Sequence, residues 1–482
     1  MNRRMVIHTL GDIALAQAAL LVLPALVSLI YPDELRVFWS FLVTICIAVV
    51  TGMLMRILSN PGTTVIFAKE GFVIVSYAWL MMSAIGALPF VLSGEIPSYV
   101  DAFFEMVSGF TTTGASILTN VEALSHGTLF WRSFSHWIGG MGVLVFVMAL
   151  VPNISDRSIH LLRAEMPGPE VGKLKPKARD TAKILYIIYI VMTCVQIIML
   201  LAGGMPLFDS VLHTFGTAGT GGFGIKSDSI GGYSPYLQWV ITVFMLLFGV
   251  NFNLYYLLLI KKFKSVFKST EIWVYFSIVL VSIVLIGFNV YNTYSSFSET
   301  LRMSAFQVSS IVTTTGYSTT DFNTWPVMSK TVLLLLMIVG ACAGSTAGGL
   351  KVSRVVLLFK AVSREFKKML HPRSVRVVKM EGKTVEEQTL SSVTVYFAIY
   401  MICTLFIFLM LSFEPFSIET NFSATLACFN NIGPGLGDVG PASSFAGYSA
   451  FSKILLSVAM LMGRLEIYPL ILGLNPLVWR KR

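Results

Sequence analysis

Charged residues are scarce in this 482-residue sequence: only 12% of its residues are Asp, Glu, Lys or Arg, against about 25% in soluble domains. Hydrophobic residues make up 55% of the chain, and its mean hydropathy is +0.75. So little charge excludes an ordinary soluble globular protein. The composition predicts a polytopic membrane protein.

Cysteine and histidine are also scarce, with five and six residues. The cysteines lie in or near apolar segments, without CxxC spacing and without histidines at the spacing of metal ligands, so we interpret them as small core residues. A membrane enzyme acting on lipid-linked substrates would need clustered histidines, acids or metal ligands at the bilayer surface, whereas the acids here are dispersed among loops. The sequence therefore predicts a protein that is not an enzyme.

Long apolar runs are abundant, and each is long enough for the roughly 20 residues that a helix needs to cross a bilayer. The runs lie at 13–31, 37–58, 71–93, 129–151, 183–203, 237–260, 272–290, 331–350, 393–413 and 450–474. We therefore expect an all-α membrane protein with ten transmembrane helices.

The net charge is +10, and most of the basic residues lie in every second loop between these spans. With a cytoplasmic N-terminus, 28 of the 35 basic residues fall on the cytoplasmic side, as the positive-inside rule requires. Both termini are thus predicted to be cytoplasmic, and the charge indicates orientation rather than binding to nucleic acid. The outer loops carry many acids, which either bias the mouth toward cations or form an ordinary solvated face.

Four short strips of hydroxyl, amide and glycine residues interrupt the apolar sequence, and each ends in a glycine. Their last glycines are 108, 94 and 117 residues apart, which indicates an internal repeat. A half-apolar segment too short to span the membrane precedes each strip, so we expect four re-entrant pore helices, at 99–110, 206–217, 300–311 and 421–429. The predicted organisation is an N-terminal helix pair (1–65), repeat one (66–152), a cytoplasmic loop with repeat two (153–268), repeat three with a broken inner helix and a basic cytoplasmic segment (269–385), and repeat four (386–482).

Non-helical backbone at membrane depth is tolerated where it lines a cavity, and a ring of carbonyls can replace the hydration shell of a cation. The strips are therefore predicted to form a selectivity filter. A single strip would more often indicate helix packing, and a structural anchor would leave all four unexplained. The expected filter glycines, where positive φ lets carbonyls face one axis, are Gly114, Gly222, Gly316 and Gly433. The expected ion ligands are Thr112, Thr113, Thr220, Gly221, Thr314, Thr315, Asn431 and Ile432.

Two GxGxxG matches, at 219–224 and 435–440, overlap the strips and follow no predicted strand, and the near match to a P-loop at 344–351 lacks the required lysine directly after its glycine. No nucleotide is therefore expected on this chain.

The glycine-rich segment 340–349 should break the helix of the third repeat and could form a movable obstruction below the filter; close helix packing is the alternative. Arg464 lies deep in the last span, where it could be a barrier to cations or could hold the carbonyls of this break, unless Glu466 pairs with it. The predicted gate residues are Gly344, Ser345, Thr346, Gly348, Gly349 and Arg464.

Taken together, these features resemble the TrkH and KtrB family of potassium transporters. The resemblance covers essentially the whole chain and rests on the strips at 111–116, 313–318 and 430–435, the glycine-rich loop and the deep arginine; the N-terminal helix pair is more like TrkH. It implies uptake of potassium or rubidium across the bacterial inner membrane by a homodimer with one gated pore per protomer. It also implies a cytosolic nucleotide-binding subunit of the TrkA type, for which we nominate the basic stretches 157–183 and 351–383 as docking surfaces.

Each strip has one glycine at the shared position rather than a full TVGYG signature, so discrimination against sodium is expected to be weaker than in a potassium channel. Gly114 stands where sodium-passing members of the wider group have serine, which favours potassium. The second strip has additional glycines and is the least certain alignment. The alternative to passive uptake is a symporter that couples potassium to protons or sodium, although the only acid near an intramembrane partner is Glu466.

Overall fold

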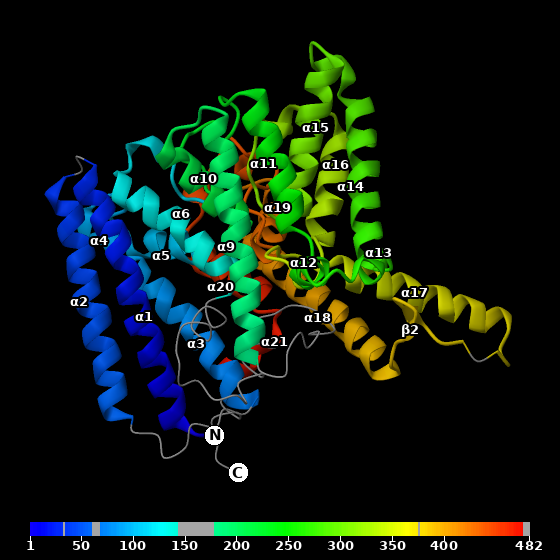
Figure 1. The fold of residues 1–482 in the computed structure, drawn as a ribbon, viewed down its shortest axis with the longest axis horizontal. Helices are drawn as coiled ribbons and strands as arrows, with labels where there is room; N and C mark the ends of the chain where they lie inside the picture. The colour runs from blue at the N-terminus through cyan, green and yellow to red at the C-terminus, as the bar shows by residue number, and fades with distance from the viewer. Residues whose placement is uncertain (32–33, 60–67, 143–177, 375, 476–482) are drawn as a thin grey trace.

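The computed structural model describes residues 1–31, 34–59, 68–142, 178–374 and 376–475, and these are almost entirely helical (Figure 1). The helices are α1 (Arg3–Ile30), α2 (Leu35–Leu58), α3 (Ala68–Gly86), α4 (Leu88–Ser93), α5 (Tyr99–Phe110), α6 (His126–Gly140), α9 (Ala178–Ala202), α10 (Leu207–Gly219), α11 (Pro235–Phe248), α12 (Phe252–Leu259), α13 (Phe263–Phe267), α14 (Thr270–Asn289), α15 (Phe297–Val312), α16 (Val327–Val339), α17 (Val352–Leu370), α18 (Glu387–Leu411), α19 (Ile418–Phe429), α20 (Ala450–Arg464) and α21 (Tyr468–Leu474). Short 3-10 turns lie at Val121–Ala123, Tyr291–Thr293, Phe322–Thr324, Gly437–Val439 and Phe445–Gly447.

A small hairpin departs from the all-α prediction. Its strands, β1 (Lys379–Met380) and β2 (Lys383–Thr384), are antiparallel. The turn between them is tight because Glu381 and Gly382 both have positive φ. The hairpin follows α17, which projects away from the bundle (Figure 1).

In the described part of the chain, not all ten predicted spans are single long helices. Six helical segments of the described chain are long and apolar enough to cross a membrane, or eight segments if each of two bent pairs is one span. Of the predicted runs, 129–151 includes α6, which ends at Gly140, and residues 143–151 lie outside the described part. The run 331–350 includes α16, which ends at Val339 as the chain enters the glycine-rich segment.

Two of the predicted runs, 237–260 and 450–474, are bent in the middle, so each is a broken span or a re-entrant loop rather than one straight helix. Between α11 and α12 the axis turns by 89°, and the Asn251 side chain accepts a hydrogen bond from Asn253 N (2.9 Å), which caps the new helix. Between α20 and α21 it turns by 119°: Glu466 and Ile467 have positive φ, and Pro469 lies in the first turn of α21. Local capping and proline chemistry thus override the apolar pattern.

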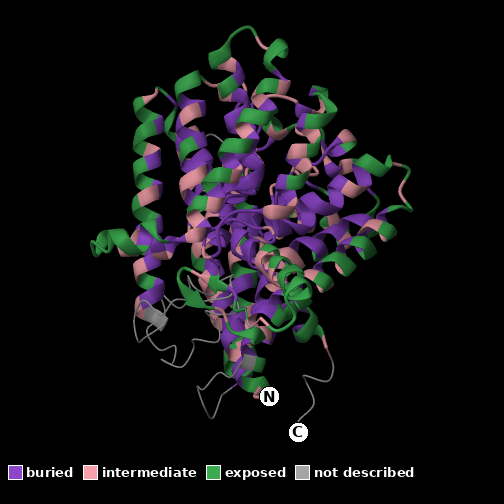
Figure 2. Cartoon of the chain, turned by 90° about the vertical axis from the view of Figure 1, so that its right-hand side faces the viewer, coloured by how far each residue is buried: buried purple, intermediate pink, exposed green. Residues whose placement is uncertain are grey.

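Burial follows the arrangement expected in lipid, with apolar side chains outside and polar groups inside. Large apolar residues such as Ile57, Phe288 and Ile402 are exposed on α2, α14 and α18. Figure 2 shows the buried residues gathered at the centre, where the polar strips lie, and exposed residues along the outer faces of the helices. A centre of this kind requires polar groups to find partners within the protein.

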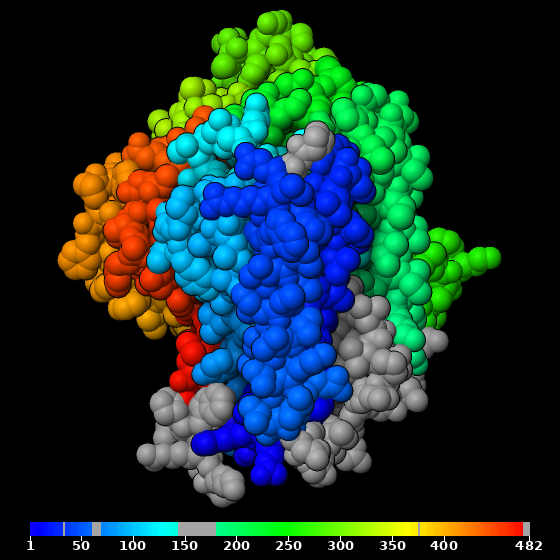
Figure 3. All heavy atoms as spheres, turned by 90° about the vertical axis from the view of Figure 1, so that its left-hand side faces the viewer, coloured from blue at the N-terminus to red at the C-terminus, as the bar shows by residue number. Residues whose placement is uncertain are grey.

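The two N-terminal helices form a closely packed pair. A Cβ on Gly11 of α1 would lie 2.8 Å from the Gly52 carbonyl oxygen of α2, an approach that small residues permit. Figure 3 shows this pair, in dark blue, on an outer face of the molecule. The predicted domain boundaries themselves stay a prediction.

Candidate functional site

Each polar strip follows a short helix (α5, α10, α15 or α19) and turns in the same way. In every strip the residue two positions before the final glycine has a left-handed φ of 54° or 55°, and the final glycine has a φ between 71° and 101°. The amide N–H of the residue directly before the final glycine donates to the carbonyl five residues earlier, which closes the helix with a Schellman motif. The left-handed residues are Thr112, Thr220, Thr314 and Asn431. The second strip therefore shares the conformation of the other three.

The four strips close into a ring. Each final glycine lies so near the carbonyl oxygen of the residue before the next glycine that an added Cβ would collide with that oxygen or, at Gly433, lie 2.8 Å from it. The pairs are Gly114 with Gly221, Gly222 with Thr315, Gly316 with Ile432, and Gly433 with Thr113. Glycine is thus required at each corner both by its positive φ and by the close approach of a carbonyl.

Buried polar oxygens lie at the inner end of the ring. Asn431 Nδ2 donates to Thr113 Oγ1 and to Met460 O, both at 2.9 Å, and so joins the fourth strip to the first. Thr112 Oγ1 and Asn431 Oδ1 are buried with no hydrogen-bond partner in the described part of the chain. Such oxygens are rare in folded proteins and point to a missing ligand or water.

A cavity of about 240 Å³ lies at the outer end of the ring. All four final glycines line it, together with outer-loop residues after each strip. The charged residues among its lining are Arg132 and Lys226. The acids of the outer loops therefore do not line this cavity, which favours an ordinary solvated face over an anionic mouth.

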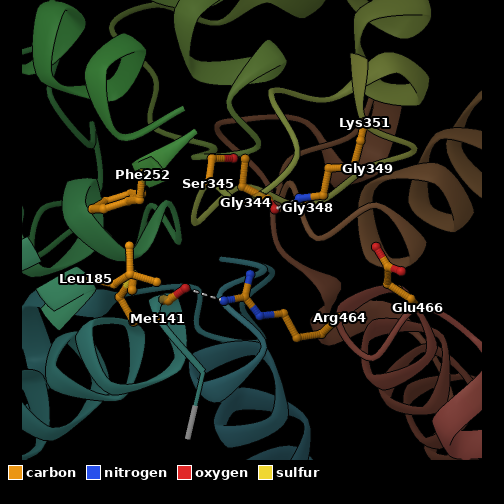
Figure 4. Close-up of a pocket in the computed structure, with 13 residues that line it drawn as sticks. Met141, Leu185, Phe252, Gly344, Ser345, Gly348, Gly349, Lys351, Arg464 and Glu466 are labelled. Atoms are coloured by element: carbon orange, nitrogen blue, oxygen red, sulfur yellow. Dashed lines mark hydrogen bonds between the residues drawn. The ribbon is translucent and has the colours of Figure 1, made fainter. Parts of the chain in front are cut away.

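The glycine-rich loop at 340–351 lies at the opposite end of the strips. The N–H of Gly348 donates to Thr314 Oγ1 (2.6 Å), and a Cβ on Gly348 would collide with the carbonyl oxygen of Asn430. Gly344, Ser345, Gly348 and Gly349 line a cavity of about 30 Å³ (Figure 4), room for about two water molecules. The loop thus touches the third and fourth strips directly.

Arg464 is the last residue of α20 and holds this loop against α6. Its Nη1 donates to Thr346 O (2.7 Å), and its Nη2 donates to Gly139 O (2.5 Å). The Nη2 group also donates to Gly140 O (2.6 Å), the contact drawn as a dashed line in Figure 4. The last carbonyls of α6 form the negative end of its dipole, which favours a cation there. Of the roles predicted for Arg464, these contacts fit the one that holds carbonyls of the break.

Glu466 accepts two hydrogen bonds from Arg354 of α17, at 3.0 and 2.6 Å. Arg354 also lies over the ring of Tyr396, with its Cζ 4.1 Å from the centroid. This ion pair ties α17 to the bend between α20 and α21. The sequence left open, as an alternative, that Glu466 pairs with Arg464; in the structure its two hydrogen bonds come from Arg354.

The family model described as TrkH, a cation transport protein, matches residues 37–476. The chain belongs to the TrkH family of cation transport proteins. It is 36% identical to the Trk system potassium uptake protein TrkH of Salmonella typhimurium over all of both chains, and 35% identical to TrkG of Escherichia coli over 99% of each. Its fold matches the crystal structure of the potassium transporter TrkH from Vibrio parahaemolyticus with a TM-score of 0.89 and 32% identity, over all of both chains.

Membership of the TrkH family confirms the resemblance seen in the sequence and makes the chain a membrane transporter rather than an enzyme. The structure brings all the predicted ligand and glycine positions into the ring, and the predicted gate residues into the loop beneath it. That these residues bind an ion or gate its passage stays a prediction.

Two residues of this TrkH-family site were missed in the sequence. Glu271 Oε1 accepts from the amides of Ala343 (2.7 Å) and Ser353 (3.1 Å), at the two ends of the loop. Lys351, predicted among the cytoplasmic charges, is 2% exposed, and its ammonium donates to the Ala347 carbonyl. The available signals were an acid at the start of a span and a lysine two residues after the glycine-rich run.

Replacing Gly114 by Ala should destabilise the folded protein by about 2–5 kcal/mol, because it adds backbone strain at positive φ to a collision with a carbonyl. The matched control is Gly287→Ala in α14, where the nearest atom, Ser304 Oγ, lies 3.8 Å away. Thermal unfolding of the detergent-purified variants measures the difference. Equal unfolding temperatures would mean that the ring contact is not as tight as described.

Proposed function

We propose that this chain takes up potassium, with rubidium as an accepted substitute, through a channel-like pore on the axis of the four strips. The observation that carries this proposal is the closed ring, in which each final glycine lies against a carbonyl of the next strip. The names of its relatives, such as the Trk system potassium uptake protein of Salmonella typhimurium, support the choice of ion.

In this proposal the strips act as a selectivity filter, and the ring residues named above supply backbone and side-chain oxygens to the ion. The unpaired oxygens of Thr112 and Asn431 are suited to a dehydrated cation, because a buried oxygen without a donor gains most from a positive charge. A potassium ion entering from the outer cavity would exchange water for these oxygens and move inward until it meets the loop.

Passive uptake is favoured over a symporter because the acids near the path are already engaged. Glu105 pairs with Arg132, Glu271 binds two amides, and Glu466 binds Arg354. A proton relay needs a carboxylate that is free to change its charge. Coupling to protons or sodium remains the alternative, and its signature is a flux that depends on those gradients.

The gate in this proposal is the loop with Arg464. With Gly348 on Thr314 and Arg464 on Thr346, the loop is held between the strips and α6, and only a small cavity remains at that point. Opening requires the loop to leave these partners, and the ion pair between Arg354 and Glu466 offers a connection from α17 to that movement.

The partner and the assembly also belong to this proposal. Of the stretch nominated at 157–183, residues 157–177 lie outside the described part, so the described candidate is 351–383. There Lys360, Arg364 and Lys367 of α17 line a hollow of about 380 Å³ with basic residues that follow the helix, which suits an acidic face of a TrkA-type nucleotide-binding subunit.

A stripe of exposed apolar residues on the same helix suits contact with a second copy in a homodimer. These residues are Phe359, Val362, Phe366, Met369 and Leu370. The excess of basic residues on one side supports insertion in the bacterial inner membrane with both termini cytoplasmic.

Rubidium uptake tests the filter. Vesicles that contain the purified chain and are loaded with potassium should accumulate external tracer rubidium. Gly316→Ser should lower uptake at least about tenfold, since about 1.4 kcal/mol in ion-binding free energy gives that factor, whereas the control Gly287→Ala should keep it. Uptake that is unchanged in Gly316→Ser would refute the filter, and uptake that follows an imposed proton or sodium gradient would favour the symporter.

Arg464→Ala should raise rubidium uptake about tenfold in vesicles without the cytosolic subunit, because the closed loop loses hydrogen bonds worth about 1.4 kcal/mol or more. Lys264→Ala, an exposed substitution on α13, is the control and should leave uptake as it is. Adding the cytosolic subunit should change uptake by the unmodified chain much more than uptake by Arg464→Ala. Equal uptake by the three proteins would remove Arg464 from the gate.

A further inference from the structure

The corner between the first and second strips differs from the others because α6 packs into it. Arg132 and His136 are one helical turn apart on α6 and so share a face of that helix. Both are buried, with 2% and 0% exposure. Each of them bridges α5, which precedes the first strip, to the residues that directly follow Gly222 of the second.

Arg132 makes an ion pair and a main-chain contact across this corner. Its Nε lies 2.6 Å from Glu105 Oε1 on α5, and its Nη1 donates to Gly224 O (2.8 Å). The Glu105 carboxylate also accepts from Ser116 Oγ (2.9 Å) and from the amide of Ile117 (3.0 Å), which follow the first strip. The guanidinium therefore connects both sides of the corner.

His136 repeats this bridge one turn further along α6. Its Nε2 accepts from the amide of Phe223 (3.3 Å), so its Nδ1 carries the proton and donates to Gly109 O (2.7 Å). The ring of Phe223 lies between the two residues, 4.2 Å from the His136 ring centroid and 3.6 Å from Arg132 Cζ.

The additional glycines of the second strip make room for this helix. A Cβ on Gly221 would collide with the His136 ring, and a Cβ on Gly219 would collide with the His136 main-chain carbonyl. At the position of Gly221 the other strips carry Thr113, Thr315 and Ile432. The imidazole thus occupies the volume that a strip side chain fills elsewhere in the ring.

At the other three corners the contacts nearest the strips are made by neutral groups. Tyr317 Oη donates to His213 O (3.1 Å), Asn323 makes two hydrogen bonds with the main chain of Gly437, and Asn431 reaches Thr113. Ion pairs also join α16 to α19 (Lys330 and Glu419) and α20 to α5 (Lys453 and Asp101), but their acids lie in the first turns of α19 and α5. The pair of Arg132 with Glu105 differs because it also contacts residues that directly follow the first and second strips.

We infer that Arg132 and His136 are positioning residues that determine ion selectivity, by fixing the glycine-rich second strip at its distance from the first. This inference rests on the proposed function of the ring as the filter. We call the contacts of Arg132 and His136 the brace. Without it the second strip, with glycine at 219, 221 and 222, is free to move its carbonyls toward a smaller ion. Discrimination between rubidium and sodium then falls while the maximal rate is retained, a separation that general loss of folded protein would not produce.

A double-mutant cycle in the vesicle assay tests this inference, with rubidium uptake as the readout of the cycle and the ratio of rubidium to sodium uptake as the readout of selectivity. Gly221→Ala alone should lose most rubidium uptake, because the added Cβ collides with the His136 ring. Uptake by the double variant His136→Ala/Gly221→Ala should be at least about threefold higher than uptake by Gly221→Ala, within the range of coupling between contacting residues. Gly219→Ala is the matched control. Its Cβ meets the His136 main chain, so His136→Ala should not rescue it.

His136→Ala by itself should lower the rubidium-to-sodium ratio at least about threefold. The neutral pair Glu105→Gln/Arg132→Gln should do the same, because it removes both charges and replaces the guanidinium by a shorter amide. This pair serves if His136→Ala does not fold. Additive effects of His136→Ala and Gly221→Ala, or a wild-type ratio in both brace variants, would overturn the inference. The unmodified chain is measured in the same vesicles. If it takes up rubidium selectively while the cycle is additive, the brace alone is wrong; if it takes up no rubidium, the filter and the brace are both wrong.

Discussion

The approach of a glycine to the carbonyl oxygen of the neighbouring strip is the contact on which the rest of the structure depends. It recurs at four corners: three of them join strips about a hundred residues apart in the chain, and the fourth joins the last strip to the first. The helices that precede the strips end in Schellman motifs with left-handed threonine or asparagine, a conformation that is strained for these residues. Such strain persists where the surroundings fix it, and here the closed ring does so.

The ring is fourfold in its backbone but not in what holds it. At one corner α6 inserts an ion pair and an imidazole, and the second strip has glycine at 219 and 221, where a Cβ would collide with His136. At the inner end, the loop and Arg464 contact the strips of the third and fourth repeats. In the proposed function, selectivity and gating therefore belong to different elements, and each of these elements breaks the symmetry of the repeat.

Much of this arrangement could be predicted from the sequence. The repeat spacing, the short helices, the final glycines and the helix break at 340 follow from local patterns that need no tertiary information, and the TrkH family membership agrees with them. The bends at Asn251 and Pro469 could not be seen in hydropathy, because an apolar run keeps its pattern when the axis turns. Three further features depend on contacts between residues that are distant in sequence, which the periodicity of apolar residues does not reveal. They are the partner of Glu466, the burial of Lys351 and the contacts of His136.

The most direct measurement of the central claim is the position of bound rubidium, located by its anomalous scattering in crystals of the unmodified protein grown with rubidium in place of potassium. We expect anomalous density on the axis of the four strips, between the outer cavity and the loop and within coordination distance of strip carbonyls, and its loss when sodium replaces rubidium. Well-ordered strips without rubidium between them, or rubidium bound only outside the ring, would contradict the account.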